Sequence, residues 1–138
     1  MSPPRVAVFV ERLGPYHAAR FAAVARRPAA LDLSVIEIAG GSTRYAWSGA
    51  GAAPFRTRSL FPRADYLALR PGELRRATRA TLTELRPEVV VANGWGFPES
   101  RAVIAWAARN GRPAAIFSDS HERDTRRVAW REALKRGV

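Results

Sequence analysis

The chain has 138 residues, of which 23 are Lys or Arg and 12 are Asp or Glu, so its formal net charge is +11. This length predicts a single compact domain, and a 47% hydrophobic fraction with 25% charged residues argues against disorder. The chain has no cysteine, and its only histidines are His17 and His121. Disulfides, thiolate zinc sites, cysteine nucleophiles and histidine-rich metal clusters are therefore excluded.

The positive charge is spread along the whole chain, and all but one of the basic residues are arginines. A nucleic-acid-binding domain concentrates its cations on one face, so nucleic acid is not an expected partner. Arg75, Arg79 and Arg86 are predicted to lie on the solvated side of one helix. A solvated basic surface is the first interpretation, and attraction to an anionic membrane surface is the alternative.

The first residues, Met1-Ser2-Pro3-Pro4, lead directly into a short apolar run and lack the basic region and cleavage site of a signal peptide. No later segment approaches the roughly 18 consecutive apolar residues of a membrane-spanning helix. We therefore expect a soluble, cytoplasmic protein, with peripheral membrane contact as the alternative.

Strands and helices are predicted to alternate along the chain. Apolar runs predict strands over residues 5–10, 31–38, 55–61, 88–92 and 113–117. The first, fourth and fifth runs are nearly continuous, as in parallel strands covered on both faces. The second run partly alternates and Arg56 and Arg58 interrupt the third, so these two are expected to be outer strands, the third at a charged edge.

Prolines and a glycine mark the helix ends. Helices are predicted from Pro15 to about Arg27, from Pro71 to before Pro87, from Pro98 to before Gly111, and from Asp124 towards Gly137. The chain over residues 40–54 is irregular, and loops of this length are usually functional or mobile.

This order of elements predicts an α/β fold, with a Rossmann-like open parallel sheet, helices on both faces and strand order 3-2-1-4-5. Ligands bind such sheets beyond the carboxyl ends of the strands, where the strand order reverses. Residues 11–17, 93–97 and 118–123 are predicted to meet there.

The first of these loops contains Gly14, which permits close approach of a ligand, and Pro15, which opens a helix whose amide end suits phosphate. The loop lacks the glycine patterns of a dinucleotide fingerprint and of a P-loop. His17 stands in the first helical turn and shares a face with Phe21 and Val24. It either contacts a ligand or covers the core.

The other two loops supply an aromatic ring and polar groups. Asn93 and Trp95 follow a buried strand, and Trp95 either stacks on a sugar ring or packs over the end of the sheet. Asp119, between Ser118 and Ser120, either accepts hydrogen bonds from a polyhydroxylated ligand or binds loop amides. No nucleophilic triad is present.

Several motifs in succession resemble the N-terminal domain of glycosyltransferase family 4 (group 1) enzymes, which have the GT-B fold. They are Gly14-Pro15-Tyr16-His17-Ala18-Ala19-Arg20, Tyr45-x-Trp47, Leu85-Arg86-Pro87-Glu88-Val89-Val90-Val91, Gly94-Trp95, and Ser118-Asp119-Ser120 followed by Asp124, Arg127, Trp130, Glu132 and Lys135. The resemblance spans nearly the whole chain, residues 1–138, as one acceptor-side domain.

The resemblance implies retaining transfer of a sugar from a nucleotide-sugar donor to a glycan or small-molecule acceptor, without a metal or other cofactor. It implies His17 and Asp119 as candidate catalytic residues. The implied substrate-binding residues are Gly14, Pro15, Tyr16, Tyr45, Trp47, Asn93, Trp95, Ser118 and Ser120. The family's donor-binding domain has no counterpart here, so we expect a fragment of a longer protein that is inactive alone. The alternative is a non-enzymatic α/β module that binds an anionic ligand or a membrane surface.

Overall fold

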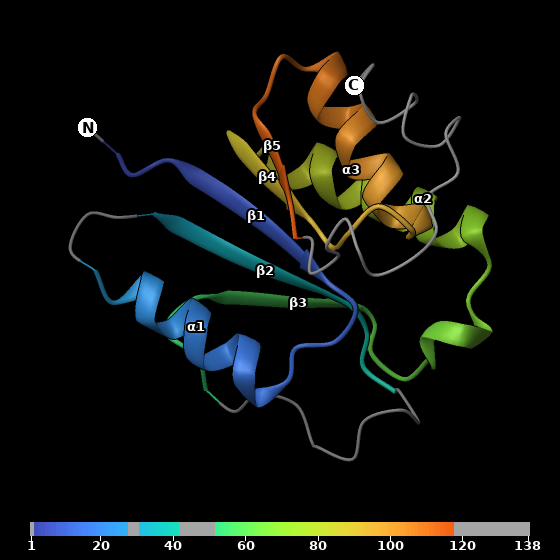
Figure 1. Cartoon of the computed structure of the whole chain (residues 1–138), viewed down its shortest axis with the longest axis horizontal. Helices are drawn as coiled ribbons and strands as arrows, with labels where there is room; N and C mark the ends of the chain where they lie inside the picture. The colour runs from blue at the N-terminus through green and yellow to red at the C-terminus, as the bar shows by residue number, and fades with distance from the viewer. Residues whose placement is uncertain (1, 28–30, 42–51, 118–138) are drawn as a thin grey trace, which may run out of the picture.

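A computed structural model of the chain describes residues 2–27, 31–41 and 52–117 (Figure 1). Within these residues five strands form one sheet in the order β3-β2-β1-β4-β5, and every neighbouring pair is parallel. The strands are β1 (Arg5–Val10), β2 (Asp32–Ala39), β3 (Arg56–Phe61), β4 (Val89–Ala92) and β5 (Ala114–Ile116). The predicted Rossmann-like α/β fold and its strand order are confirmed.

Three of the predicted helices lie in the described part of the chain, and each begins at the predicted proline: α1 (Pro15–Ala25), α2 (Pro71–Leu85) and α3 (Pro98–Arg109). Gly111 follows the end of α3 with φ +60°, which confirms the left-handed position predicted for it. A short 3-10 helix over Tyr66–Ala68 was not predicted, and the Asp65 side chain caps it by accepting from the Leu67 N–H at 2.9 Å. Sequence periodicity does not detect so short a turn.

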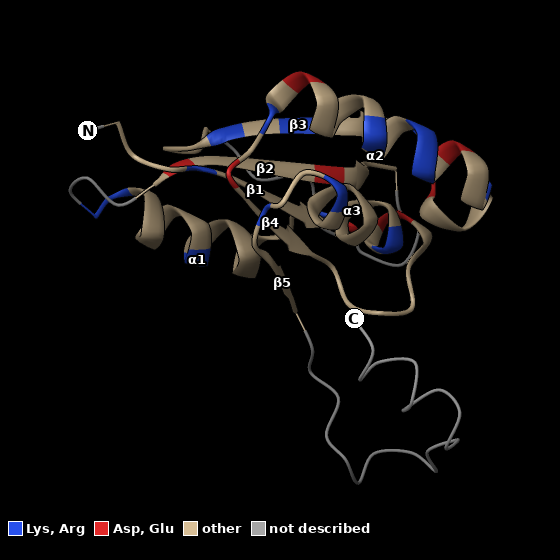
Figure 2. Cartoon of the chain, turned by 90° about the horizontal axis from the view of Figure 1, so that it is seen from above, with Lys and Arg blue, Asp and Glu red and all other residues tan. Residues whose placement is uncertain are grey.

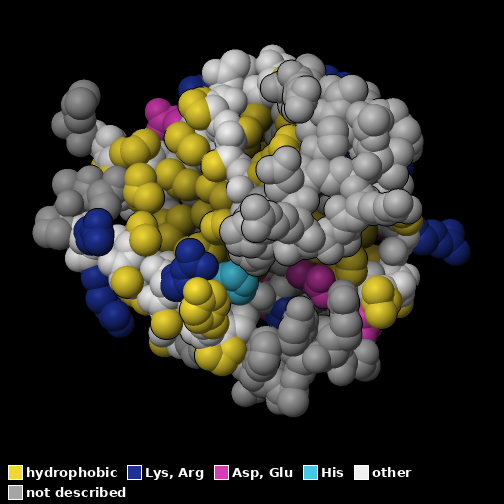
Figure 3. Space-filling view, in the orientation of Figure 1, with side chains coloured by type: hydrophobic (Ala, Val, Ile, Leu, Met, Phe, Trp, Pro, Cys, Tyr) yellow, Lys and Arg dark blue, Asp and Glu magenta, His cyan; other side chains and the backbone are white. Residues whose placement is uncertain are grey.

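The helices cover both faces of the sheet, with α1 on one face and α2 and α3 on the other (Figure 2). In β1 the side chains alternate between two cores, since Val6 and Val8 pack on the α1 side whereas Ala7 and Phe9 pack against α2 and α3. This is why the strand reads as one continuous apolar run. Hydrophobic side chains also gather over the sheet beside α1 (Figure 3). Val91 of β4 is half-buried and packs against the core cluster that contains Phe21 of α1.

The outer strands of the described sheet are β3 and β5. The expectation that residues 31–38 also form an outer strand was wrong, because β2 pairs with both β1 and β3. Arg56 and Arg58 of β3 are exposed and pair with Asp32 and Glu84, which confirms the predicted charged edge. The fifth strand was expected to be covered on both faces. Within the described residues it pairs with β4 alone, as the predicted strand order requires, but Ala114 and Ala115 are exposed, so the expectation that both faces are covered was wrong. The composition of an alanine-rich run does not show whether both faces of the strand are covered.

The predicted helix over residues 124–137 and most of the irregular segment 40–54 lie outside the described residues. Among the helices that the structure describes, none has the length and apolar character needed to cross a membrane.

Candidate functional site

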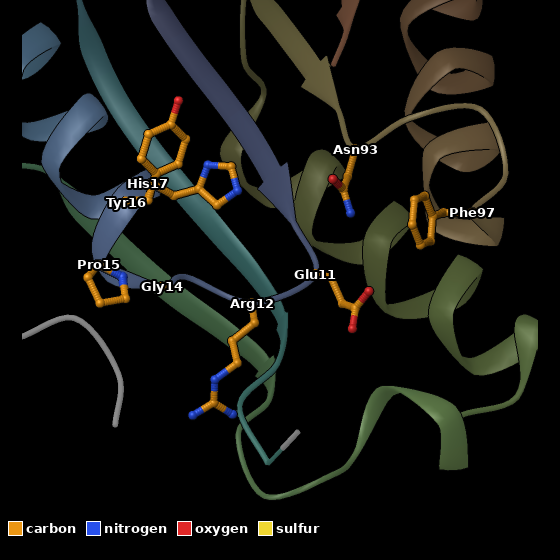
Figure 4. Close-up of a pocket in the computed structure, with 8 residues that line it drawn as sticks. All are labelled: Glu11, Arg12, Gly14, Pro15, Tyr16, His17, Asn93 and Phe97. Carbon is orange, nitrogen blue, oxygen red and sulfur yellow. The ribbon is translucent and has the colours of Figure 1, made fainter. Parts of the chain in front are cut away.

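A pocket of about 450 Å³ lies beyond the carboxyl ends of β1 and β4, where the strand order reverses (Figure 4). It is lined by Glu11, Arg12, Gly14, Pro15, Tyr16, His17, Asn93 and Phe97. The loop after β1 and the loop after β4 were both predicted to meet at this edge of the sheet. The structure brings them together around one cavity.

The loop after β1 is held by the carboxyl end of β2. The Glu11 carbonyl accepts from the Ala39 N–H at 3.0 Å, and the Leu13 N–H donates to the Glu37 carboxylate at 3.0 Å. The Arg12 guanidinium donates to the Gly40 carbonyl, so this side chain extends towards the end of β2 (Figure 4). These contacts hold the loop that leads into α1 against the end of β2.

The first turn of α1 forms one side of the pocket. Gly14 is the N-cap residue, supplies no side-chain hydrogen bond, and its carbonyl accepts from the Ala18 N–H at 2.9 Å. The amide end of a helix carries a partial positive charge that favours anionic groups. Three predicted ligand-binding residues therefore lie together at the partially positive end of this helix, namely Gly14, Pro15 and Tyr16.

His17 lies both at the pocket and against the core, the two positions that were predicted as alternatives. It lines the pocket and is half-buried, and its ring stacks on Phe21 with centroids 5.9 Å apart and planes inclined by 13°. The Phe117 ring lies 6.4 Å away. Tyr16 is 70% exposed, and the Arg20 guanidinium lies 5.2 Å from the centre of its ring. The His17 ring thus forms a wall of the pocket that rests on the core.

The loop after β4 places its predicted residues in different surroundings. Asn93 lines the pocket, whereas Trp95, 40% exposed, lines a separate cavity with Ile104 and Ile116. Gly94 between them has φ +77°, a conformation that side chains disfavour, so this turn requires glycine. The structure therefore groups Asn93 but not Trp95 with the residues of the first loop.

The structure adds three pocket residues that were not selected from the sequence, namely Glu11, Arg12 and Phe97. Glu11 and Arg12 stand directly after a buried strand at the predicted edge, which is a signal that could have identified them. Phe97 precedes α3, and its ring packs edge to face against Tyr66, with centroids 5.9 Å apart and planes inclined by 80°.

Among the acidic residues that the structure describes, Glu99, the second residue of α3, is the one classed as buried. Its side chain is fully buried, one carboxyl oxygen accepts from the Tyr66 hydroxyl at 2.9 Å, and the other has no hydrogen-bond partner. The pKa of the Glu99 carboxyl is raised above its ordinary value, chiefly because the group is buried. Hydrogen bonds to its own amide and to Tyr66 oppose this rise, and the charge of Glu11 adds to it. Sequence gave no signal for this, because an acid in a first helical turn is ordinarily solvated.

The remaining predicted site residues, Tyr45, Trp47, Ser118, Asp119 and Ser120, lie outside the described residues. In the part of the chain that the structure describes, no group of three or more His, Asp or Glu side chains is arranged to hold a metal ion.

No protein-family model and no curated protein matches this chain. The described residues form an α/β domain with a five-stranded parallel sheet and a pocket at the point where the strand order reverses.

Proposed function

We propose that this chain is the acceptor-side domain of a glycosyltransferase, which transfers a sugar from a nucleotide-sugar donor to a glycan or small-molecule acceptor with retention. The observation that carries the proposal is the pocket between the loops after β1 and β4, because it joins a glycine-capped helix end to polar and aromatic side chains. Carbohydrate sites combine these groups, since hydroxyls need hydrogen-bonding partners and the sugar ring packs on aromatic faces.

In this proposal the first turn of α1 faces the donor diphosphate, because the helix dipole and amide groups favour negative charge there. His17 and Asn93 then contact the transferred sugar of the donor from opposite sides of the pocket. Asp119, Tyr45, Trp47, Trp95, Ser118 and Ser120 belong to the acceptor side on the strength of the sequence resemblance alone. Transfer needs donor and acceptor held together, so a second domain that grips the nucleotide sugar is part of the proposal.

Titration of the chain with a panel of nucleotide sugars and free hexoses, followed by amide NMR, tests this function. We expect saturable shifts at Gly14, Tyr16 and Asn93, and no turnover by this chain alone. Binding to anionic vesicles that salt abolishes, with no saturable response to any sugar or nucleotide sugar, would contradict the proposal and favour a membrane-binding module.

A further inference from the structure

Three side chains form a series of contacts that runs from the buried side of α3 to the pocket. The Glu99 carboxyl accepts from the Tyr66 hydroxyl at 2.9 Å, and the Tyr66 ring packs edge to face against the Phe97 ring, with centroids 5.9 Å apart. Phe97 lines the pocket on the side away from α1 (Figure 4). A buried carboxyl that is not itself a lining residue is therefore connected to one wall of the pocket through two direct contacts.

The surroundings of the Glu99 carboxyl suit its protonated form. The side chain is fully buried, and its Oε1 atom has no hydrogen-bond partner among the described residues. A protonated carboxyl leaves at most one neutral hydroxyl without a partner there. An ionised carboxylate would instead leave a charged oxygen without a donor or water, which costs far more free energy in a buried site.

Few other groups compensate for this burial. Among the described residues, the titratable groups that act on the Glu99 carboxyl are Tyr66, whose hydrogen bond favours ionisation, and Glu11, whose charge disfavours it. The backbone N–H of Glu99 also favours ionisation, and no described basic residue is among the groups that act on it. Burial outweighs these contributions, so the pKa of the carboxyl is raised.

The 3-10 helix is the weaker side of the contact with Glu99. None of its three described residues, Tyr66–Ala68, is buried, and Leu67 is 70% exposed. Five residues of α3 are buried by contrast. Segments with few buried contacts open at a lower free-energy cost than segments anchored in a core. We therefore expect water to reach an ionised Glu99 by displacement of Tyr66 rather than of α3.

We propose that Glu99 is a positioning residue whose proton holds Tyr66, and through it Phe97, at the wall of the pocket. When the carboxyl gives this proton to water, the Tyr66 ring withdraws and Phe97 loses the neighbour that supports it. The pocket is then complete only while Glu99 is protonated. The consequence for ligand binding rests on the proposed function and concerns the regulation of that same site.

NMR of the whole chain without ligand tests this coupling. A carbon-13 label in the glutamate carboxyls follows the titration of Glu99, and nuclear Overhauser contacts between the Tyr66 and Phe97 rings report their packing. We expect these ring contacts below the midpoint of the Glu99 titration and their loss above it. Ring contacts that persist unchanged after Glu99 has ionised would overturn the proposal, as would a Glu99 carboxyl that does not titrate while the chain is folded.

Glu99→Gln separates the proton from the hydrogen bond. Glutamine keeps an oxygen that can accept from Tyr66 but has no titratable proton, so the ring contacts should persist at every pH. Their loss in Glu99→Gln with the pH dependence of the wild type would assign the change to another group and overturn the proposal. Glu84→Gln is the matched control, because it removes an exposed carboxyl of α2 and should leave the wild-type pH dependence unchanged.

Affinity for a nucleotide sugar provides a second measurement. In the wild type it should fall by up to about tenfold for each pH unit above the Glu99 midpoint, because a single proton is involved, and Glu99→Gln should not show this fall. His17 and Glu11 are ionisable and line the pocket, but both variants retain them, so the difference isolates Glu99. Equal pH dependence in the two proteins would overturn the regulation and leave the glycosyltransferase proposal standing. If no nucleotide sugar binds, the proposed function falls, whereas the ligand-free measurement still decides the role of Glu99.

Discussion

The Tyr66 hydroxyl donates a 2.9 Å hydrogen bond to the buried carboxyl of Glu99, 33 residues further along the chain. This contact joins the 3-10 helix before α2 to the first turn of α3. It also places an ionisable group where water does not reach it. The consequences for stability can be measured independently of any ligand.

Glu99 should make the protein less stable as the pH rises. Because burial raises the pKa of its carboxyl in the folded state, the unfolded chain releases this proton first, and the folded state loses stability above the ordinary pKa of 4.5. Relative to Glu99→Gln, the wild type should therefore lose free energy of unfolding as the pH rises above 4.5 and through the raised pKa of the Glu99 carboxyl. Urea unfolding of both proteins at several pH values checks this.

Glu84→Gln provides a control of opposite sign. The hydrogen bond and charge of Arg58 lower the pKa of the exposed Glu84 carboxyl, so its contribution is present above the ordinary pKa and is lost as the pH falls through the lowered value. Relative to its Gln variant, each wild-type carboxyl should change the free energy of unfolding with pH in the opposite direction to the other. The same direction of change for both would contradict the raised pKa of Glu99 or the lowered pKa of Glu84.

Gly40 should not tolerate a side chain. A Cβ atom there would lie 2.6 Å from the Pro62 carbonyl oxygen and 3.2 Å from a Glu37 carboxyl oxygen, and a backbone carbonyl cannot easily move away. We expect Gly40→Ala to lower the free energy of unfolding by about 1–3 kcal/mol. Chemical unfolding monitored by circular dichroism measures this.

Gly72→Ala is the matched substitution, since a Cβ atom at this position in α2 meets nothing within 4 Å. Alanine is the better helix former, so this change should raise stability by about 0.5–1 kcal/mol. Similar losses in both variants would show that Gly40 is not constrained by close packing.

Glu37 should determine the rigidity of the loop after β1. Its carboxylate accepts from the partly buried Leu13 N–H, and removing the acceptor leaves that donor unsatisfied. Glu37→Ala should cost about 1–3 kcal/mol and speed hydrogen exchange at the Leu13 amide. Glu37→Gln keeps an oxygen acceptor and should retain most of the protection. Equal exchange rates in all three proteins would contradict this role.

Tyr16 should contribute to ligand binding without contributing to stability. Its side chain is 70% exposed at the pocket, so Tyr16→Ala should change the free energy of unfolding by no more than about 0.5 kcal/mol. It should weaken nucleotide-sugar binding measured by calorimetry. Leu67 is also 70% exposed but does not line the pocket, and Leu67→Ala should leave binding unchanged. Equal affinity for the two variants would remove Tyr16 from the site.

The local pattern of residues was sufficient to predict most of the fold. Pro15, Pro71 and Pro98 begin the three described helices because proline suits the first turn and disrupts later ones. The apolar runs of β1 and β4 predict central strands, since strands buried on both faces carry apolar side chains at successive positions. Alternation of these elements then allows few topologies, so strand order 3-2-1-4-5 and the edge that carries the pocket could be predicted.

Tertiary structure alone decided which contacts between remote segments shape the pocket and its surroundings. Leu13 and Glu37 are 24 residues apart and Tyr66 and Glu99 are 33 apart, and both pairs meet only after the sheet and helices have packed. The burial of Glu99, the support of Phe97 by Tyr66, and the separation of Trp95 from Asn93 follow from that packing. Sequence periodicity reports local conformation, whereas burial and electrostatic coupling depend on distances between segments that are remote along the chain.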